Sequence, residues 1–230
     1  MRRAVDVEAP RTGAADAGLS MVELLVSLML ASLLLVLVGT TFVQLVITTA
    51  TVTVARESGG SASTVATELS KVIRSASTNT VSGVAVPDPA IVSGTDNALV
   101  LYSYIDTGSV TPKPTMVQFT IVAGQIVEKR WATTSVASPW VFPALTATPT
   151  NTVTYPGIHV PDGVTPLFAY LDATDTPVAP GVGLTAAQRP LIASIRISVR
   201  IRPATPTTAK PTAIVNVVGM PNVAIKRVTP

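Results

Sequence analysis

Residues 24–47 form an uninterrupted run without a charged side chain, and this run limits what the chain can fold into. An α-helix rises about 1.5 Å per residue, so these positions extend about 36 Å. The hydrocarbon core of a bilayer is roughly 30 Å thick. The sequence therefore predicts one transmembrane helix near the amino terminus, at about 24–47.

The charges beside this run indicate its orientation. Arg2, Arg3 and Arg11 precede it, whereas Arg56 is the only basic residue in the 20 positions that follow. Basic flanks of a membrane span stay in the cytoplasm. We therefore expect a single-pass membrane protein with a cytoplasmic amino terminus and its bulk outside the cytoplasm.

Glu23 stands directly before the uncharged run and is the only ionisable side chain between Asp16 and Arg56. A carboxylate at the entrance of a membrane helix is costly without a partner, so it is a candidate functional residue. Gly18 precedes it by five positions and is followed by the apolar Leu19.

These residues, followed by Leu-Leu-Val-Ser-Leu, resemble the processing site of type IV prepilins and pseudopilins, although Leu19 replaces the usual aromatic residue. The resemblance covers about 30 of the 230 residues. It implies that residues 1–18 are a leader removed by a prepilin peptidase, that Leu19 is then N-methylated, and that Glu23 acts in filament assembly. The implied partners are other pilin or pseudopilin subunits, the inner-membrane assembly platform and membrane lipid.

Two other interpretations of the amino terminus stay open. A secretory signal peptide has an apolar core of 7–15 residues, shorter than this run, and a positively charged leader. Here the leader balances its three arginines with Asp6, Glu8 and Asp16. An uncleaved signal anchor also fits, because spacing alone does not show that a peptidase acts.

Proline placement predicts one long amino-terminal helix over 19–78. Of the 19 prolines, Pro10 is the first and the other 18 lie at position 87 or later, so the strongest helix breaker is missing between them. An apolar stripe with helical spacing continues past the membrane run, at Val65, Leu69, Val72, Ile73 and Ala76. Glu68, Lys71 and Arg74 occupy the other face. Two helices separated at Gly59-Gly60 are the alternative.

Residues 79–230 are expected to form a β-rich head. Short apolar or alternating runs separated by Pro, Gly and Asp are typical of antiparallel strands, and they occur at 81–86, 98–104, 116–122, 126–131, 167–171, 192–201, 213–218 and 223–228. Ala123-Gly124 predicts a tight hairpin turn, and 132–166 predicts long loops. A helix followed by strands indicates the α+β class.

The head also resembles the carboxyl-terminal part of large minor pilins, including the J-type minor pseudopilin of type II secretion. The residues that carry this weaker resemblance are Leu167-Phe168-Ala169-Tyr170-Leu171-Asp172, the strand at 192–201, and the closing stretch 221–227. It implies a pilin-like fold, in which the long helix packs on the antiparallel sheet.

Arg196, Arg200 and Arg202 alternate with apolar residues, so strand geometry places all three on one face. Such a face can contact the phosphates of DNA. It can equally pair with acidic neighbours or remain solvated, and no aromatic cluster accompanies it for base stacking.

The remaining polar residues favour no catalytic or metal site. The chain has no cysteine and a single histidine, His159, which we expect on a surface loop. Asp162, Asp172 and Asp175 fit turn residues better than a calcium loop. No Gly-x-Ser-x-Gly elbow is present.

The sequence therefore predicts no enzyme, no cofactor and no bound metal. It favours a minor pilin or pseudopilin. The alternative is a non-filamentous, membrane-anchored binding module that uses the basic strand or the loops.

Overall fold

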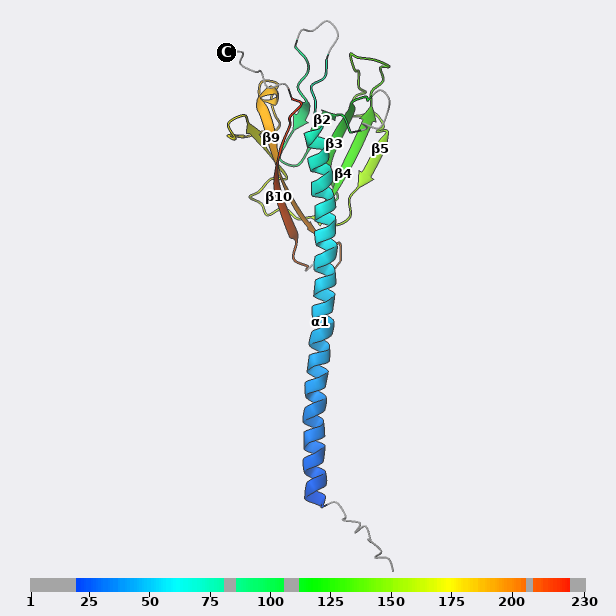
Figure 1. Cartoon of the computed structure of the whole chain (residues 1–230), viewed down its shortest axis with the longest axis vertical. Coiled ribbons are helices and arrows are strands. Elements are labelled where there is room, and N and C mark those ends of the chain that lie inside the picture. Colours follow the sequence, from blue (N-terminus) through cyan, green and yellow to red (C-terminus); the bar gives the residue numbers. More distant parts are fainter. Residues whose placement is uncertain (1–19, 81–85, 106–111, 206–208, 224–230) are drawn as a thin grey trace, which may run out of the picture. The chain divides into compact units, whose positions relative to one another are not determined.

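The computed structural model describes residues 20–80, 86–105, 112–205 and 209–223, which contain one long helix, one 3-10 turn and ten strands (Figure 1). The chain divides into two compact units, Met1–Ala50 and Thr51–Pro230. The elements are α1 (Met21–Arg74), β1 (Ile91–Gly94), β2 (Leu99–Ser103), β3 (Thr115–Val122), β4 (Gln125–Ala132), β5 (Asn151–Thr154), β6 (Ile158–His159), β7 (Phe168–Asp172), β8 (Pro177–Val178), η1 (Arg189–Leu191), β9 (Ile192–Arg202) and β10 (Thr212–Gly219).

Helix α1 continues without interruption through Gly59 and Gly60, where the sequence allowed a break. Buried Ser58 and Ala62 stand on either side of the glycine pair and fix the helix against the head. The helix ends at Arg74, earlier than the expected 78, because Ala76 already pairs with Ser103 of β2. The predicted apolar stripe, Val65 to Ala76, is confirmed as fully buried.

The first sheet is an antiparallel meander in the order β1-β2-β3-β4-β5. Val122 pairs with Gln125, so Ala123 and Gly124 form the predicted two-residue hairpin turn. Their φ angles are +50° and +80°, and two positive values are typical of a type I′ turn.

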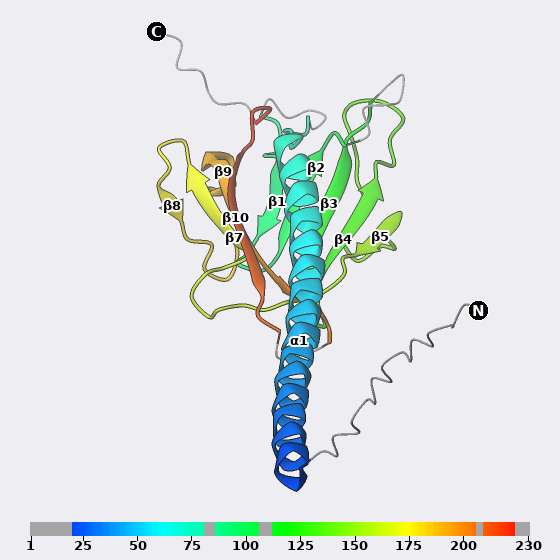
Figure 2. The ribbon, with the colours of Figure 1, turned by 60° about the horizontal axis from the view of Figure 1, so that its bottom comes forward.

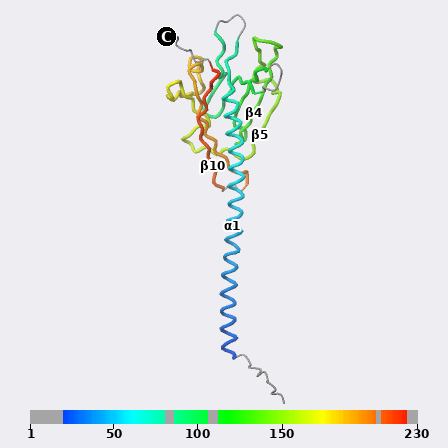
Figure 3. Tube along the Cα trace, in the orientation of Figure 1, coloured from blue at the N-terminus to red at the C-terminus, as the bar shows by residue number. Residues whose placement is uncertain are grey.

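The second sheet has the order β10-β9-β7-β8 (Figure 2). The short β6 also pairs with β9. Its pairs are all antiparallel. The Cα trace of Figure 3 shows β10 beside the distal part of α1. Side-chain hydrogen bonds join the two elements: the Ser58 and Thr212 hydroxyls lie 3.0 Å apart, and Asn216 Nδ2 donates to Ser70 Oγ at 3.2 Å.

The main core lies among the distal part of α1 and the inner faces of both sheets, and includes Leu69, Phe119 and Phe168. A smaller cluster, Val100, Met116 and Trp131, occupies the opposite face of the first sheet. The loop after β4 covers this cluster: Trp131 Nε1 donates to Ala147 O at 2.9 Å, and Phe142 stacks on Tyr102.

Six of the eight predicted strands are confirmed, within one or two residues at each end. The predicted strands 81–86 and 223–228 lie almost wholly outside the described residues. Four short strands were not predicted: β1, β5, β6 and β8. Two of these, β5 and β6, lie within the expected loop region 132–166.

Candidate functional site: the anchor and the polar surfaces of the head

The first half of α1 has the properties of a membrane anchor. In the described part of the chain it is the one helix long and apolar enough to span a bilayer. The large apolar side chains from Leu24 to Ile47 are all more than half exposed, so protein does not cover them. A bilayer is the environment in which this apolar surface leaves contact with water.

Hydroxyl groups within the anchor bind its own backbone. Ser27 Oγ donates to Glu23 O at 2.8 Å, Ser32 Oγ to Met29 O at 2.8 Å, and Thr40 Oγ1 to Leu37 O at 2.9 Å. Hydrocarbon offers no hydrogen-bond partner, so a polar group there needs one inside the protein. These hydroxyls are therefore compatible with a lipid environment.

Glu23 lies in the first turn of α1, where the backbone N–H groups lack intrahelical acceptors. The side chain is exposed, and within the described residues its carboxylate forms no ion pair. A carboxylate is favoured at this end by the helix dipole. The predicted leader 1–18 and the cleavage pair Gly18-Leu19 lie outside the described residues.

The basic residues of β9 lie on one face of the strand, as their alternation predicts, but in different environments. Arg200 Nη1 pairs with Asp162 Oδ2 at 2.5 Å, and Arg202 Nη1 donates to Pro203 O at 3.4 Å. Arg196 is exposed. The strand thus offers a nucleic acid one exposed arginine and two with protein partners, and DNA contact stays a prediction.

His159 is not on a surface loop, contrary to the sequence prediction. It belongs to β6, where it pairs with Ile201 of β9, and only 5% of it is exposed. Its backbone N–H donates to Gly124 O at 2.7 Å, which connects β6 to the hairpin of the first sheet. Burial and the nearby Arg200 charge lower the pKa of His159, whereas Asp162 opposes this shift.

Asp162 and Asp172 serve the turns that contain them. Asp162 Oδ1 accepts from the N–H groups of Val164 and Thr165, and Asp172 Oδ1 accepts from those of Thr174 and Thr176. These bonds lower the pKa of both carboxyl groups, with the backbone of Thr165 contributing most at Asp162 and the Thr174 hydroxyl at Asp172. Asp175 adopts a φ of +59° in the same turn as Asp172.

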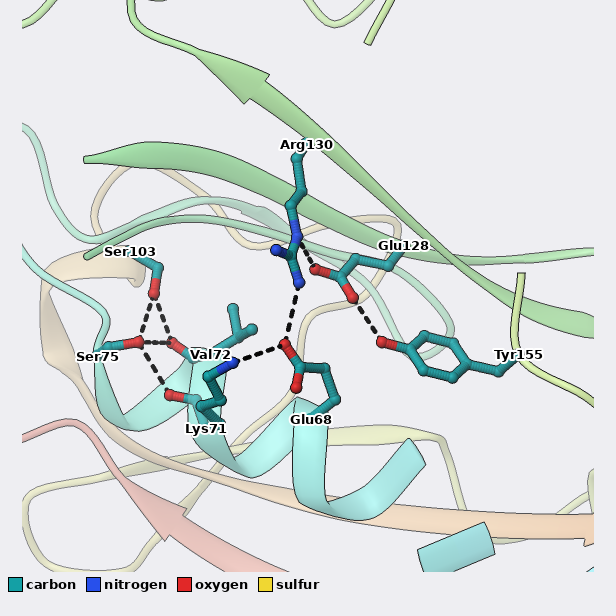
Figure 4. A network of polar contacts seen from close by, with 8 residues as sticks. All are labelled: Glu68, Lys71, Val72, Ser75, Ser103, Glu128, Arg130 and Tyr155. Atoms are coloured by element: carbon teal, nitrogen blue, oxygen red, sulfur yellow. Dashed lines mark hydrogen bonds and ion pairs between the residues drawn. The ribbon is translucent and has the colours of Figure 1, made fainter. Parts of the chain in front are cut away.

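A charged network connects α1 to the first sheet (Figure 4). The sequence predicts its weak pair between Glu68 and Lys71 but not its connection to the sheet. Glu128 of β4 is fully buried; it accepts from Arg130 Nε at 2.5 Å and from the Tyr155 hydroxyl at 2.5 Å. Arg130 Nη2 then reaches Glu68 Oε1 of α1 at 3.0 Å, and Lys71 Nζ lies 3.5 Å from the same oxygen.

The hydrogen bonds and ion pairs of the network offset the desolvation cost of its charged groups. Burial and the hydrogen bond to Glu128 raise the pKa of the Tyr155 hydroxyl, so it stays a donor. Burial lowers the pKa of Arg130, but the bond to Glu128 and the charges of Glu128 and Glu68 outweigh it, and the net shift is upward. A sequence signal existed: Ile126, Glu128 and Arg130 share one face of β4, and Ile126 belongs to the core.

A second contact fixes the end of α1 to β2. The buried Ser103 hydroxyl lies 2.6 Å from Ser75 Oγ and donates to Val72 O at 2.9 Å. The charged network and the Ser103 hydrogen bonds both hold α1 through polar groups at the margin of the apolar core (Figure 4).

No protein-family model matches the chain. No curated protein matches it either.

Proposed function

We propose that this protein is a minor type IV pilin or pseudopilin, a structural subunit stored in the membrane and assembled into a filament outside the cytoplasm. The observation that carries the proposal is the coincidence of Gly18, Leu19 and Glu23 with the start of an uncharged run long enough to cross a bilayer. The continuation of the same helix into an antiparallel β head agrees with a pilin-like organisation.

In this proposal, Glu23 sets the register between neighbouring subunits. Cleavage after Gly18 creates an amino group four residues away from Glu23, at Leu19. Where helices pack in a filament and exclude water, an unpaired carboxylate costs several kcal/mol. The amino terminus of an adjacent subunit is the partner that removes this cost.

Processing is the first test. We expect protein co-expressed with a prepilin peptidase to begin at Leu19 and to carry one N-methyl group, as measured by intact mass and terminal-peptide sequencing. Gly18→Leu is the matched variant, and we expect it to retain residues 1–18. A mature protein that begins at Met1, or near Thr51, would contradict the proposal and favour the membrane-anchored binding module.

Assembly is the second test. We expect Glu23→Ala and Glu23→Gln to be cleaved and to keep a folded head, while their incorporation into sheared filaments falls at least tenfold. The Gln variant keeps the shape of the side chain and removes its charge, so it isolates charge pairing. Incorporation of both variants at the level of the unmodified protein would show that Glu23 does not set the register.

A further inference from the structure

Strand β10 (Thr212–Gly219) is an edge strand that lacks the sequence features by which such edges are usually blocked. It spans eight residues, pairs only with β9 in the described sheet, and contains no charged residue and no proline. The other edge strands are short: β1 has four residues and a register shift, β5 has four residues, and β8 has two, one of which is Pro177. Long unprotected edges recruit further strands, which is why proteins usually block them.

The register identifies which backbone groups of β10 are free. Met220 N donates to Ala193 O at 3.0 Å, and Gly219 stands opposite Ser194. Because bonded and non-bonded pairs alternate in an antiparallel ladder, the even-numbered residues of β10 bond to β9. The N–H and C=O groups of the odd-numbered residues, Ala213, Val215, Val217 and Gly219, therefore point to the open edge.

A groove of about 470 Å³ lies between this edge and α1, within the size range of small-molecule sites. Hydrogen bonds from β10 to Ser58 and Ser70 hold the strand along the helix. The helical wall of the groove is mostly small, with Ser63, Ala66, Thr67 and Ser70. Another strand beside β10 would thus pack on α1 without meeting a bulky side chain.

The charge of the groove indicates what kind of strand fits. Lys71 and Arg74 line it, and none of its lining residues is acidic. Lys71 lies near Glu68, but Glu68 also binds Arg130, whose other carboxylate partner is Glu128. Lys71, Arg74 and Arg130 thus carry three positive charges against the two negative charges of Glu68 and Glu128. One positive charge is left to attract a ligand.

We propose that the edge of β10 is a docking site for an extended acidic segment of another protein chain, which adds to the second sheet as a further strand. Its backbone pairs with Val215 and Val217, its inward side chains rest on the small residues of α1, and a carboxylate meets Lys71 and Arg74. This inference does not depend on cleavage after Gly18 or on filament assembly.

Two occupants from this chain itself fit less well. The carboxyl-terminal stretch 224–230 contains Lys226 and Arg227 and no acidic residue, so its charge opposes that of the groove. The β10 strand of a second copy carries no charge with which to meet Lys71 and Arg74.

The test uses the full chain in detergent micelles and a labelled eight-residue peptide, Glu-Glu-Val-Thr-Val-Thr-Val-Thr, with a Lys-Lys version as the charge control. Affinity is measured by fluorescence anisotropy, and the site is located by amide hydrogen exchange. We expect the peptide to slow exchange at Val215 and Val217 and to bind at least tenfold more tightly than the Lys-Lys version. Lys71→Gln combined with Arg74→Gln should remove that preference.

Val215→Pro removes an N–H group that points to the open edge, so no hydrogen bond to β9 is lost. Proline is tolerated at edge-strand positions of this kind. We expect it to weaken peptide binding at least tenfold, while Val215→Thr, which keeps the N–H, binds as the unmodified chain does. Val217→Pro is the second variant if Val215→Pro does not fold. Unchanged binding by a folded proline variant, or unchanged exchange at Val215 and Val217, would overturn the proposal.

The alternative occupants give different results. A concentration-dependent dimer that Val215→Pro abolishes, without peptide binding, would assign the edge to a second copy. Peptide binding that appears only after residues 224–230 are deleted would assign the edge to the chain's own terminus. Either result would overturn the proposed occupant.

Discussion

Glu128 illustrates how much one buried side chain can determine. Its carboxylate is fully buried, and the two groups that bind it, the Arg130 guanidinium and the Tyr155 hydroxyl, have their polar atoms directed at it. Removing Glu128 leaves the Tyr155 hydroxyl without its acceptor and Arg130 with Glu68 as its remaining carboxylate partner. Removing one partner of a buried ion pair costs about 3–5 kcal/mol.

We therefore expect Glu128→Ala to lower the free energy of unfolding by about 3–5 kcal/mol. Tyr155→Phe should cost less, about 1–3 kcal/mol, because it removes one hydrogen bond and no charge. Urea denaturation followed by circular dichroism measures both. Lys71→Gln is the control, because the exposed ion pair of Lys71 with Glu68 should contribute no more than about 1 kcal/mol to stability. A Glu128→Ala variant as stable as that control would show that the network does not hold the sheet to the helix.

At the scale of elements, Gly59 and Gly60 lie within α1 although nothing requires glycine there. A Cβ atom at either position would meet no atom within 4 Å. Alanine is more favourable than glycine in a helix by about 1 kcal/mol. We therefore expect Gly60→Ala to raise the free energy of unfolding by about 0.5–1 kcal/mol.

The matched variant for Gly60→Ala is Gly157→Ala. Gly157 has a φ of +90°, and its Cβ would overlap Ile201 and approach Arg202 O at 3.0 Å. That substitution should be destabilising, and thermal unfolding of the two variants side by side separates the effects. A loss of stability in Gly60→Ala would contradict this expectation.

The long elements were predictable because their signals repeat. The stripe from Val65 to Ala76 has five apolar positions, and β9 alternates over the ten residues from Ala193 to Arg202, so both patterns can be recognised without tertiary information. Strands of two to four residues, such as β6 and β8, contain too few positions for a period to show. They exist because a longer neighbour offers them an edge.

The contrast between local and distant signals also explains which placements of polar residues could be predicted. The face shared by Arg196, Arg200 and Arg202 follows from local geometry. Asp162, the partner of Arg200, lies 38 residues away, and Glu68, the helical partner of Arg130, lies 62 residues away; no local pattern indicates these two pairs. His159 was misplaced for that reason, since Pro and Gly beside it predict a loop while a distant strand buries it.

For the whole molecule, the pKa shifts predict that acid destabilises the head in two steps. His159 has a pKa below its ordinary value of 6.5, so the unfolded chain takes up a proton first, and stability falls as the pH decreases through that value. Asp162 and Asp172 have pKa values below the ordinary 3.8, so their contribution is present above 3.8 and is lost as the pH falls below it.

Urea midpoints measured from pH 8 to pH 3 test this expectation. His159→Gln should remove the step that begins near 6.5 and leave the lower step in place. Asp162→Asn should weaken the lower step, and it should enlarge the upper step because the Asp162 charge opposes the downward shift of the His159 pKa. A midpoint that stays constant from pH 7 to pH 5 in the unmodified protein would contradict the role assigned to His159.

The loop that covers the outer face of the first sheet has an optical consequence. Trp131 lies beneath that loop and Trp140 lies within it, where its carbonyl accepts from Asn79 at 3.0 Å. These are the two tryptophans of the chain, and α1 contains none. Intrinsic fluorescence will therefore report the detachment of this loop, through a red shift of emission when Trp131 becomes exposed to water. Insertion of the anchor into lipid would leave the spectrum unchanged, because the helix has no tryptophan.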